Sequence, residues 1–131
     1  MRLLGIDYGT KRIGLALSDE AGQFAYPHVV LPNTSKVIEQ IATICRGDGV
    51  GEIVLGWSLD YARKENPLMK KIKVFQTALA EATKIPITLE DEVLTTREAN
   101  QEIGQDDFTD ARAAAIILRT YLARRQTSRY T

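Results

Sequence analysis

The sequence predicts an α/β protein built on a mixed five-stranded sheet flanked by helices. Two apolar segments near the amino terminus are separated only by a short turn, and short apolar segments later alternate with residues at helical spacing. Closely spaced strands pair antiparallel, whereas strands joined through helices pair parallel. We therefore expect antiparallel hairpin strands first and parallel strands after them.

The first two strands are expected at residues 2–7 and 12–18, where leucine and β-branched side chains dominate. The turn of residues 8–11 between them is short enough for a hairpin. A third extended segment is expected at residues 24–30.

A first helix follows this segment, and Thr34 or Ser35 is placed to cap its start. Glycines after the apolar pattern are expected to end it, and a short buried strand comes next at residues 53–55. The apolar pattern consists of Val37, Ile38, Ile41, Ile44 and Cys45, and the glycines are Gly47, Gly49 and Gly51.

Pro67 suits the first position of a second helix, because its fixed φ is helical and its missing N–H is not needed there. A strand is then expected at residues 85–89, and Thr95 with Glu98 forms a capping box for a short helix that ends at Gly104. The apolar stripe of the second helix consists of Leu68, Ile72, Phe75, Leu79 and Ala82.

The last helix is alanine-rich and is expected to run from about Asp110 to Arg124. At 131 residues the chain has the size of one domain, so we expect residues 1–131 to form a single domain with a frayed tail at 126–131. No apolar stretch approaches the roughly 20 residues of a membrane span, and no signal-peptide core is present, so a cytoplasmic protein without membrane partners is expected. One histidine and one cysteine exclude a disulfide within the chain and a zinc cluster.

Charge is balanced overall but unevenly distributed. With 17 basic and 17 acidic residues, the chain is not a globally basic nucleic-acid binder. Residues 90–110 hold eight acids and one arginine, whereas the segment after Asp110 holds arginines and no acid. An acidic centre with basic margins is typical of a metal-dependent site that binds phosphates, although solvated helix faces give the same pattern.

Acidic residues end two predicted strands and begin the last helix. Asp7 follows the first strand, residues 90–92 end the last strand, and Asp107 and Asp110 begin the final helix. Carboxylates that crowd together repel one another unless they share a cation, so their convergence predicts bound Mg²⁺ or Mn²⁺. The alternatives are that Asp7 only stabilises its turn and that Asp107 only caps a helix.

Four motifs lie in order along nearly the whole chain: Gly5 to Ala16, Ile53 to Gly56, Asp91-Glu92 with Leu94-Thr95-Thr96 and Ala99, and Asp110-Ala111 with Ala114 to Leu118. Together they resemble the YqgF/RuvX family of Holliday-junction-resolvase-like proteins.

The resemblance implies a ribonuclease H-like fold and a bacterial nuclease linked to maturation of the 5′ end of 16S ribosomal RNA precursor or to junction resolution. By position, Asp7, Glu92 and Asp110 would be the metal-binding catalytic residues, with Asp91 and Asp107 as further candidate ligands. Neighbours on a strand point to opposite faces, so Asp91 and Glu92 are not expected to bind one metal equally.

Candidate nucleic-acid contacts flank these acids. Lys11 and Arg12 would meet phosphates, Trp57 could stack on an unpaired base, and Arg63 lies in the same loop. The resemblance also has gaps: relatives usually carry an arginine where this chain has Val93, and the loop of residues 57–63 differs.

Three other functions are open from the sequence. The gaps just named are compatible with an inactive module that binds RNA or ribosomal particles, and branched DNA is an alternative substrate to precursor rRNA. The Gly5–Thr10 segment also resembles a phosphate loop of actin-like and Hsp70-like ATPases, but only one such lobe is present.

Resolution of a junction would require a two-fold dimer, and no segment indicates that interface, so a monomer is favoured.

Overall fold

The protein folds around one mixed sheet with helices on both faces. The computed structural model describes residues 1–57, 67–91 and 108–129. The five strands lie in the order β3-β2-β1-β4-β5. They are β1 (Arg2–Tyr8), β2 (Arg12–Ser18), β3 (Ala25–Pro32), β4 (Val50–Trp57) and β5 (Ile87–Asp91).

The sheet has the predicted mixture of directions. β2 pairs antiparallel with both β1 and β3, while β4 pairs parallel with β1 and β5. The carboxyl ends of β1, β4 and β5 therefore meet at one edge, where ligands usually bind in open α/β sheets.

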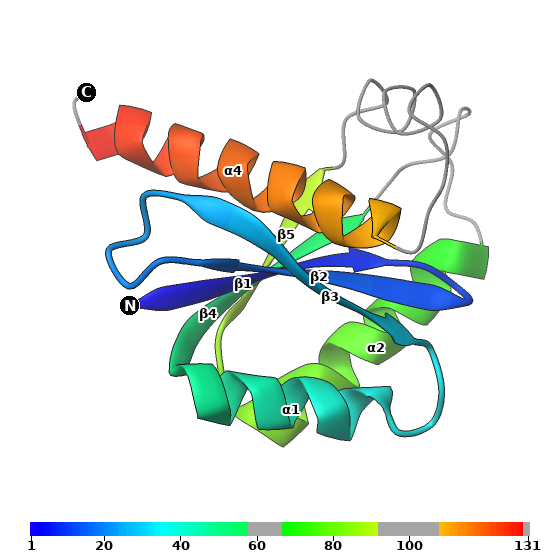
Figure 1. Cartoon of the computed structure of the whole chain (residues 1–131). Helices are drawn as coiled ribbons and strands as arrows, with labels where there is room; N and C mark the ends of the chain where they lie inside the picture. Colours follow the sequence, from blue (N-terminus) through cyan, green and yellow to red (C-terminus); the bar gives the residue numbers. More distant parts are fainter. Residues whose placement is uncertain (58–66, 92–107, 130–131) are drawn as a thin grey trace.

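Within the described residues, three helices cover the sheet. α1 (Val37–Asp48) and α2 (Pro67–Thr83) lie on one face, and α4 (Thr109–Arg129) crosses the other. Figure 1 shows that all three helices begin at the end of the sheet where β1 turns into β2. The positive ends of three helix dipoles therefore lie at the same edge as the carboxyl ends of the parallel strands.

Apolar side chains fill both layers between sheet and helices. Alternation along β1 sends Leu4 and Ile6 toward α1 and α2, and sends Leu3 toward α4. Cys45 also lies in the α1–α2 layer, where burial raises the pKa of its thiol to about 11. At neutral pH this thiol is protonated and suited to packing rather than to nucleophilic chemistry.

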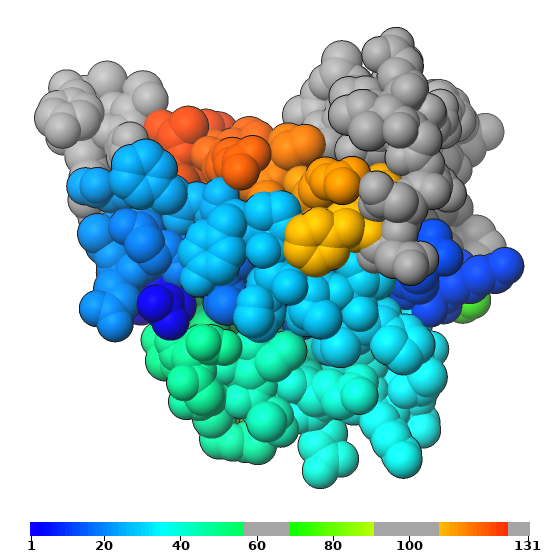
Figure 2. Space-filling model, in the orientation of Figure 1, coloured from blue at the N-terminus to red at the C-terminus, as the bar shows by residue number. Residues whose placement is uncertain are grey.

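The strand β3 forms one edge of the sheet and lies at the surface between α4 above it and α1 below it (Figure 2). Pro27 and Pro32 interrupt the backbone donors along this strand. Prolines on an edge strand oppose pairing with another chain.

None of the described helices is long and apolar enough to cross a membrane.

The start of α1 differs from the prediction, whereas its end falls at one of the expected glycines. Lys36 occupies the N-cap position without a side-chain cap, and Thr34 Oγ1 instead accepts a hydrogen bond from the N–H of Lys36 at 3.2 Å. Thr34 therefore stabilises the turn that leads into α1. At the other end, Gly47 lies inside the helix, and Gly49 ends it with a left-handed φ of 66°.

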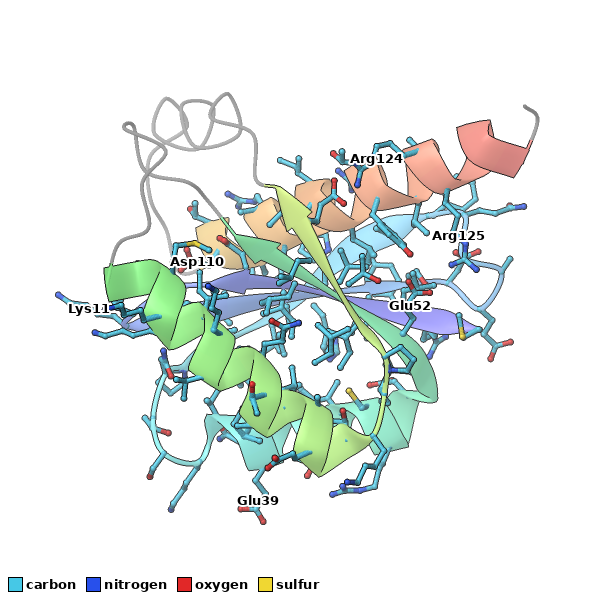
Figure 3. The ribbon with its side chains drawn as sticks, turned by 180° about the vertical axis from the view of Figure 1, so that it is seen from behind. Lys11, Glu39, Glu52, Asp110, Arg124 and Arg125 are labelled. Carbon is cyan, nitrogen blue, oxygen red and sulfur yellow. The ribbon has the colours of Figure 1, made fainter. Side chains whose placement is uncertain are left out.

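The last helix is longer than the sequence suggested. It extends to Arg129, beyond the expected end near Arg124. Contacts with the sheet explain the extension: Arg125 pairs with Glu52 at 3.2 Å, and the hydroxyl of Tyr121 donates to the same carboxylate. Figure 3 shows Glu52, Arg124 and Arg125 together at this end of α4.

Glu90 is a buried acid that forms an ion pair at the same end of the helix. The sequence grouped it with the acids at the end of β5, but its side chain is 2% exposed and pairs with Arg124 of α4. The Arg124 side chain is 64% exposed, so the guanidinium reaches inward from the surface. Glu90 therefore fastens β5 to α4.

We expect Arg124→Ala to lower the free energy of unfolding by about 2 kcal/mol, because Glu90 stays buried after losing this cation. Urea denaturation measures the change. The double variant Glu90→Met/Arg124→Met should be closer to wild type, and Arg46→Ala on the exposed side of α1 should change stability by less than about 0.5 kcal/mol. An Arg124→Ala variant as stable as Arg46→Ala would show that the Glu90–Arg124 ion pair contributes nothing to the free energy of unfolding.

Candidate active site at the carboxyl edge of the sheet

Asp7 lies in a row of residues that cross the sheet. It pairs with Gly14 of β2 on one side and with Gly56 of β4 on the other. A Cβ added to Gly14 or Gly56 would meet atoms of α4, so the side chains in this row face α4. Asp7 is therefore a buried carboxylate with no side chain on either neighbour, in the layer between the sheet and α4.

The start of α4 brings Asp110 to the same place. Asp110 is in the first turn of α4, and a Cβ on Gly14 would lie 1.9 Å from its carbonyl oxygen. Asp110 thus lies directly over the residue that pairs with Asp7. Two carboxylate residues that are 103 positions apart in the sequence (110 − 7 = 103) meet at one edge and on one face of the sheet.

Arg12 contacts Asp110. The Nε of Arg12 donates to Oδ2 of Asp110 at 2.9 Å, and both side chains remain partly exposed. The sequence suggested Arg12 only as a phosphate contact. Its pairing with a candidate metal ligand was not predicted, because the two residues are 98 positions apart.

The turn between β1 and β2 holds the other candidate cation. Lys11 is exposed and lies at the same end of the molecule as Asp110 (Figure 3). Asn33 fixes this turn: its side-chain amide donates to the carbonyl of Gly9 at 2.9 Å, and its backbone N–H donates to the carbonyl of Lys11 at 2.9 Å. The position of Lys11 is thus set by the end of β3 as well as by the hairpin.

Several predicted site residues lie outside the described part of the chain. They are Glu92, Asp107 and Arg63, together with the Thr95–Glu98 capping box, and nothing is described of the side chains of Trp57 and Asp91. Asp91 is the last residue of β5, where it pairs with Trp57 of β4. Among residues 1–57, 67–91 and 108–129, no group of three histidine, cysteine or acidic side chains is arranged to hold a metal ion.

The described donors at this edge are chemically suited to a hard cation. Asp7 and Asp110 offer only carboxylate oxygens, which are the ligands that Mg²⁺ and Mn²⁺ prefer. Magnesium sites often use one or two protein carboxylates and retain several waters. The two residues therefore fit a divalent metal by the chemistry of their donors.

Comparison with known protein families identifies the family of this chain. A family model described as RuvX, Holliday junction resolvase, matches residues 1–124. The chain belongs to the RuvX family. The expected family membership is thus confirmed over almost the full length.

RuvX relatives of similar length occur in several bacteria. A protein of Maridesulfovibrio salexigens is 34% identical, over 95% of this chain and 99% of its own length. One of Desulforudis audaxviator is 36% identical over the whole of both chains. Both are named, provisionally, as pre-16S rRNA nucleases.

Solved structures confirm the ribonuclease H-like fold that the sequence predicted. Thermus thermophilus RuvC in complex with a Holliday junction substrate superimposes with a TM-score of 0.66, at 17% identity and 96% coverage of both chains. The fowlpox virus Holliday junction resolvase superimposes with a TM-score of 0.58, at 12% identity, covering 95% of this chain and 99% of its own.

Proposed function

We propose that this RuvX-family chain is a divalent-metal-dependent nuclease that hydrolyses phosphodiester bonds in structured nucleic acid. The observation that supports this most directly is the meeting of Asp7 and Asp110 on one face of the sheet, at the edge where the parallel strands end. The proposal includes a single domain that acts as a monomer in the cytoplasm.

Asp7, Asp110 and Glu92 would hold the metal. Glu92 is the third candidate because of its position in the acidic motif that resembles the family, and Asp91 is the alternative. Asp107 remains a candidate for a fourth.

Mg²⁺ or Mn²⁺ held there by Asp7, Asp110 and Glu92 would supply activation of water and neutralisation of phosphate charge. The protein contributes the position of the acids, because the backbones of β1 and α4 hold Asp7 and Asp110. Lys11 and Arg12 are close enough to the edge to attract the phosphates of the substrate by their charge.

The substrate proposed first is the 5′ end of 16S ribosomal RNA precursor. Relatives that match this chain over nearly their whole length carry names that refer to this RNA. A four-way DNA junction is the second candidate, because the matching family model is described as a Holliday junction resolvase.

The experiment compares two substrates with one catalytic control. Purified protein is incubated with a precursor rRNA leader joined to the mature 5′ end and, separately, with a four-way DNA junction, with Mg²⁺, with Mn²⁺ or with chelator. We expect metal-dependent cleavage of the RNA by wild type and none by Asp7→Asn. Preferred cleavage of the junction would replace the RNA assignment, and RNA binding without cleavage under every metal condition would leave only a binding module.

Arg12 gives this proposal a test that does not depend on cleavage. A cation that binds Asp110 competes with the Arg12 guanidinium, so we expect Arg12→Gln to bind Mn²⁺ about three-fold to ten-fold more tightly by calorimetry. The gain is moderate because the ion pair is partly exposed and already screened by solvent.

Lys11→Gln removes the same charge from the neighbouring position and is the matched control. It should increase Mn²⁺ affinity less than Arg12→Gln, since the short contact with Asp110 belongs to Arg12. Equal or weaker Mn²⁺ binding by Arg12→Gln, relative to Lys11→Gln, would exclude the competition.

A further inference from the structure

A hollow lies on the other face of the sheet, beside the candidate active site. It has a volume of about 410 Å³, is open to solvent, and lies between the start of α1 and the first half of α2. Tyr8 and Phe75 form its floor, with ring centroids 4.9 Å apart. Val37 and Ile38 line it from α1, and Val74 lines it from α2. We call this hollow the α1–α2 groove.

The groove is joined to the candidate active site through β1 and the hairpin turn. Tyr8 follows Asp7 directly in β1, so alternation places Asp7 toward α4 and Tyr8 toward the groove. Asn33, which also lines the groove, holds the turn of Gly9 and Lys11 through two hydrogen bonds. A ligand that crosses the end of β1 would reach both the candidate active site and the α1–α2 groove.

The chemistry of the groove matches one unpaired nucleotide. Its interior is mainly apolar, Val74 is 70% exposed, and the ionisable side chains that line it, apart from the Tyr8 phenol, are those of Lys70 and Lys71. A nucleobase presents a flat apolar face, and its phosphates carry negative charge, so a nucleotide can satisfy both parts of the surface. An apolar peptide would leave the lysines without a counter-charge.

We propose that the α1–α2 groove binds the base of an unpaired nucleotide in the strand next to the scissile phosphate, with Lys70 and Lys71 holding the adjoining phosphates. This inference rests on the proposed nuclease function and narrows its substrates to structured nucleic acid with a single-stranded extension. Such an extension follows the edge of the sheet from Asp110 past Lys11 to α2.

The test compares two RNA hairpins, one blunt and one with a single-stranded tail of about ten nucleotides. Both are labelled, and their affinities are measured by fluorescence anisotropy in the Asp7→Asn background, which prevents cleavage. We expect the tailed hairpin to bind about ten-fold more tightly than the blunt one. The variants Val74→Glu and Lys70→Gln/Lys71→Gln should each abolish most of this difference while leaving the blunt hairpin nearly unaffected.

Lys84→Glu is the matched control, because it reverses an exposed charge at the other end of α2, outside the groove. It should retain the preference for the tail. Thermal melting verifies that Val74→Glu stays folded, as expected for a side chain that is mostly exposed. Equal affinity for the two hairpins, or a loss with Lys84→Glu as large as with Val74→Glu, overturns the groove assignment.

The experiments distinguish failure of the groove assignment from failure of the proposed nuclease function. Cleavage by wild type with unchanged KM and kcat for the tailed substrate in Val74→Glu would reject the groove and leave the nuclease intact. A tail preference that depends on Val74, in a protein that cleaves no substrate, would support the groove and reject the nuclease.

Discussion

Replacing Asp7 by asparagine is expected to reduce phosphodiester cleavage about a thousand-fold or more without unfolding the protein. The substitution keeps the shape of the side chain and removes its negative charge. A metal ligand at the centre of the site supplies several kcal/mol of transition-state stabilisation, and each 1.36 kcal/mol corresponds to a factor of ten in rate. Single-turnover cleavage of the precursor RNA, at saturating Mg²⁺ and Mn²⁺, measures the loss.

The position of Asp7 makes this variant informative about chemistry rather than folding. Asp7 lies between Gly14 and Gly56, so an isosteric amide meets no side chain on either paired residue. The matched control is Asp48→Asn at the end of α1, where the carboxylate pairs only loosely with Arg2 at 3.7 Å. Asp48→Asn should cleave at the wild-type rate. Equal cleavage by wild type and Asp7→Asn would reject Asp7 as a catalytic residue.

The sequence predicted most of the fold because its signals are local. The hairpin of β1 and β2 and the start of α2 at Pro67 each follow from the conformational preferences of neighbouring residues, and both are confirmed. The predicted N-cap of α1 was wrong because the Thr34 hydroxyl accepts a hydrogen bond from the N–H of Lys36, just before the helix begins, a local alternative that hydroxyl side chains offer.

The pairings within the site were harder to predict because they join distant segments. Nothing near Arg12 in the sequence indicates Asp110, and nothing near Glu90 indicates Arg124. Glu90 illustrates the difficulty: it belongs to an acidic run, yet the strand register turns it toward α4 and buries it. Charge patterns identify the region of a site, whereas register and helix packing decide which of its acids face one another.

Gly14 is expected to be as important for the site as the acids themselves. A Cβ added at Gly5, Gly14 or Gly56 would meet atoms of α4, and at Gly14 the nearest are the carbonyl oxygen of Asp110 at 1.9 Å and its carbon at 2.1 Å. These are backbone atoms of the first turn of α4, so they cannot rotate away as the end of a side chain can. Gly14→Ala must therefore push the start of α4 away from the sheet.

We expect Gly14→Ala to lower the free energy of unfolding by about 3 kcal/mol. Its second effect is specific to the site, because the first turn that moves also holds Asp110. Mn²⁺ affinity and cleavage should both fall in protein that remains folded, and calorimetry under native conditions separates this loss from instability.

Gly47→Ala is a control that should change the free energy of unfolding in the opposite direction. Gly47 lies exposed within α1, and a Cβ there would meet no atom within 4 Å. Alanine is the better helix former, so this variant should gain up to about 1 kcal/mol of stability and retain wild-type Mn²⁺ binding. If Gly14→Ala matched Gly47→Ala in stability and metal affinity, close packing of α4 on β2 would not be what positions Asp110. If only Gly14→Ala lost both, the glycine at the centre of β2 would set the separation of two carboxylates that belong to opposite ends of the chain.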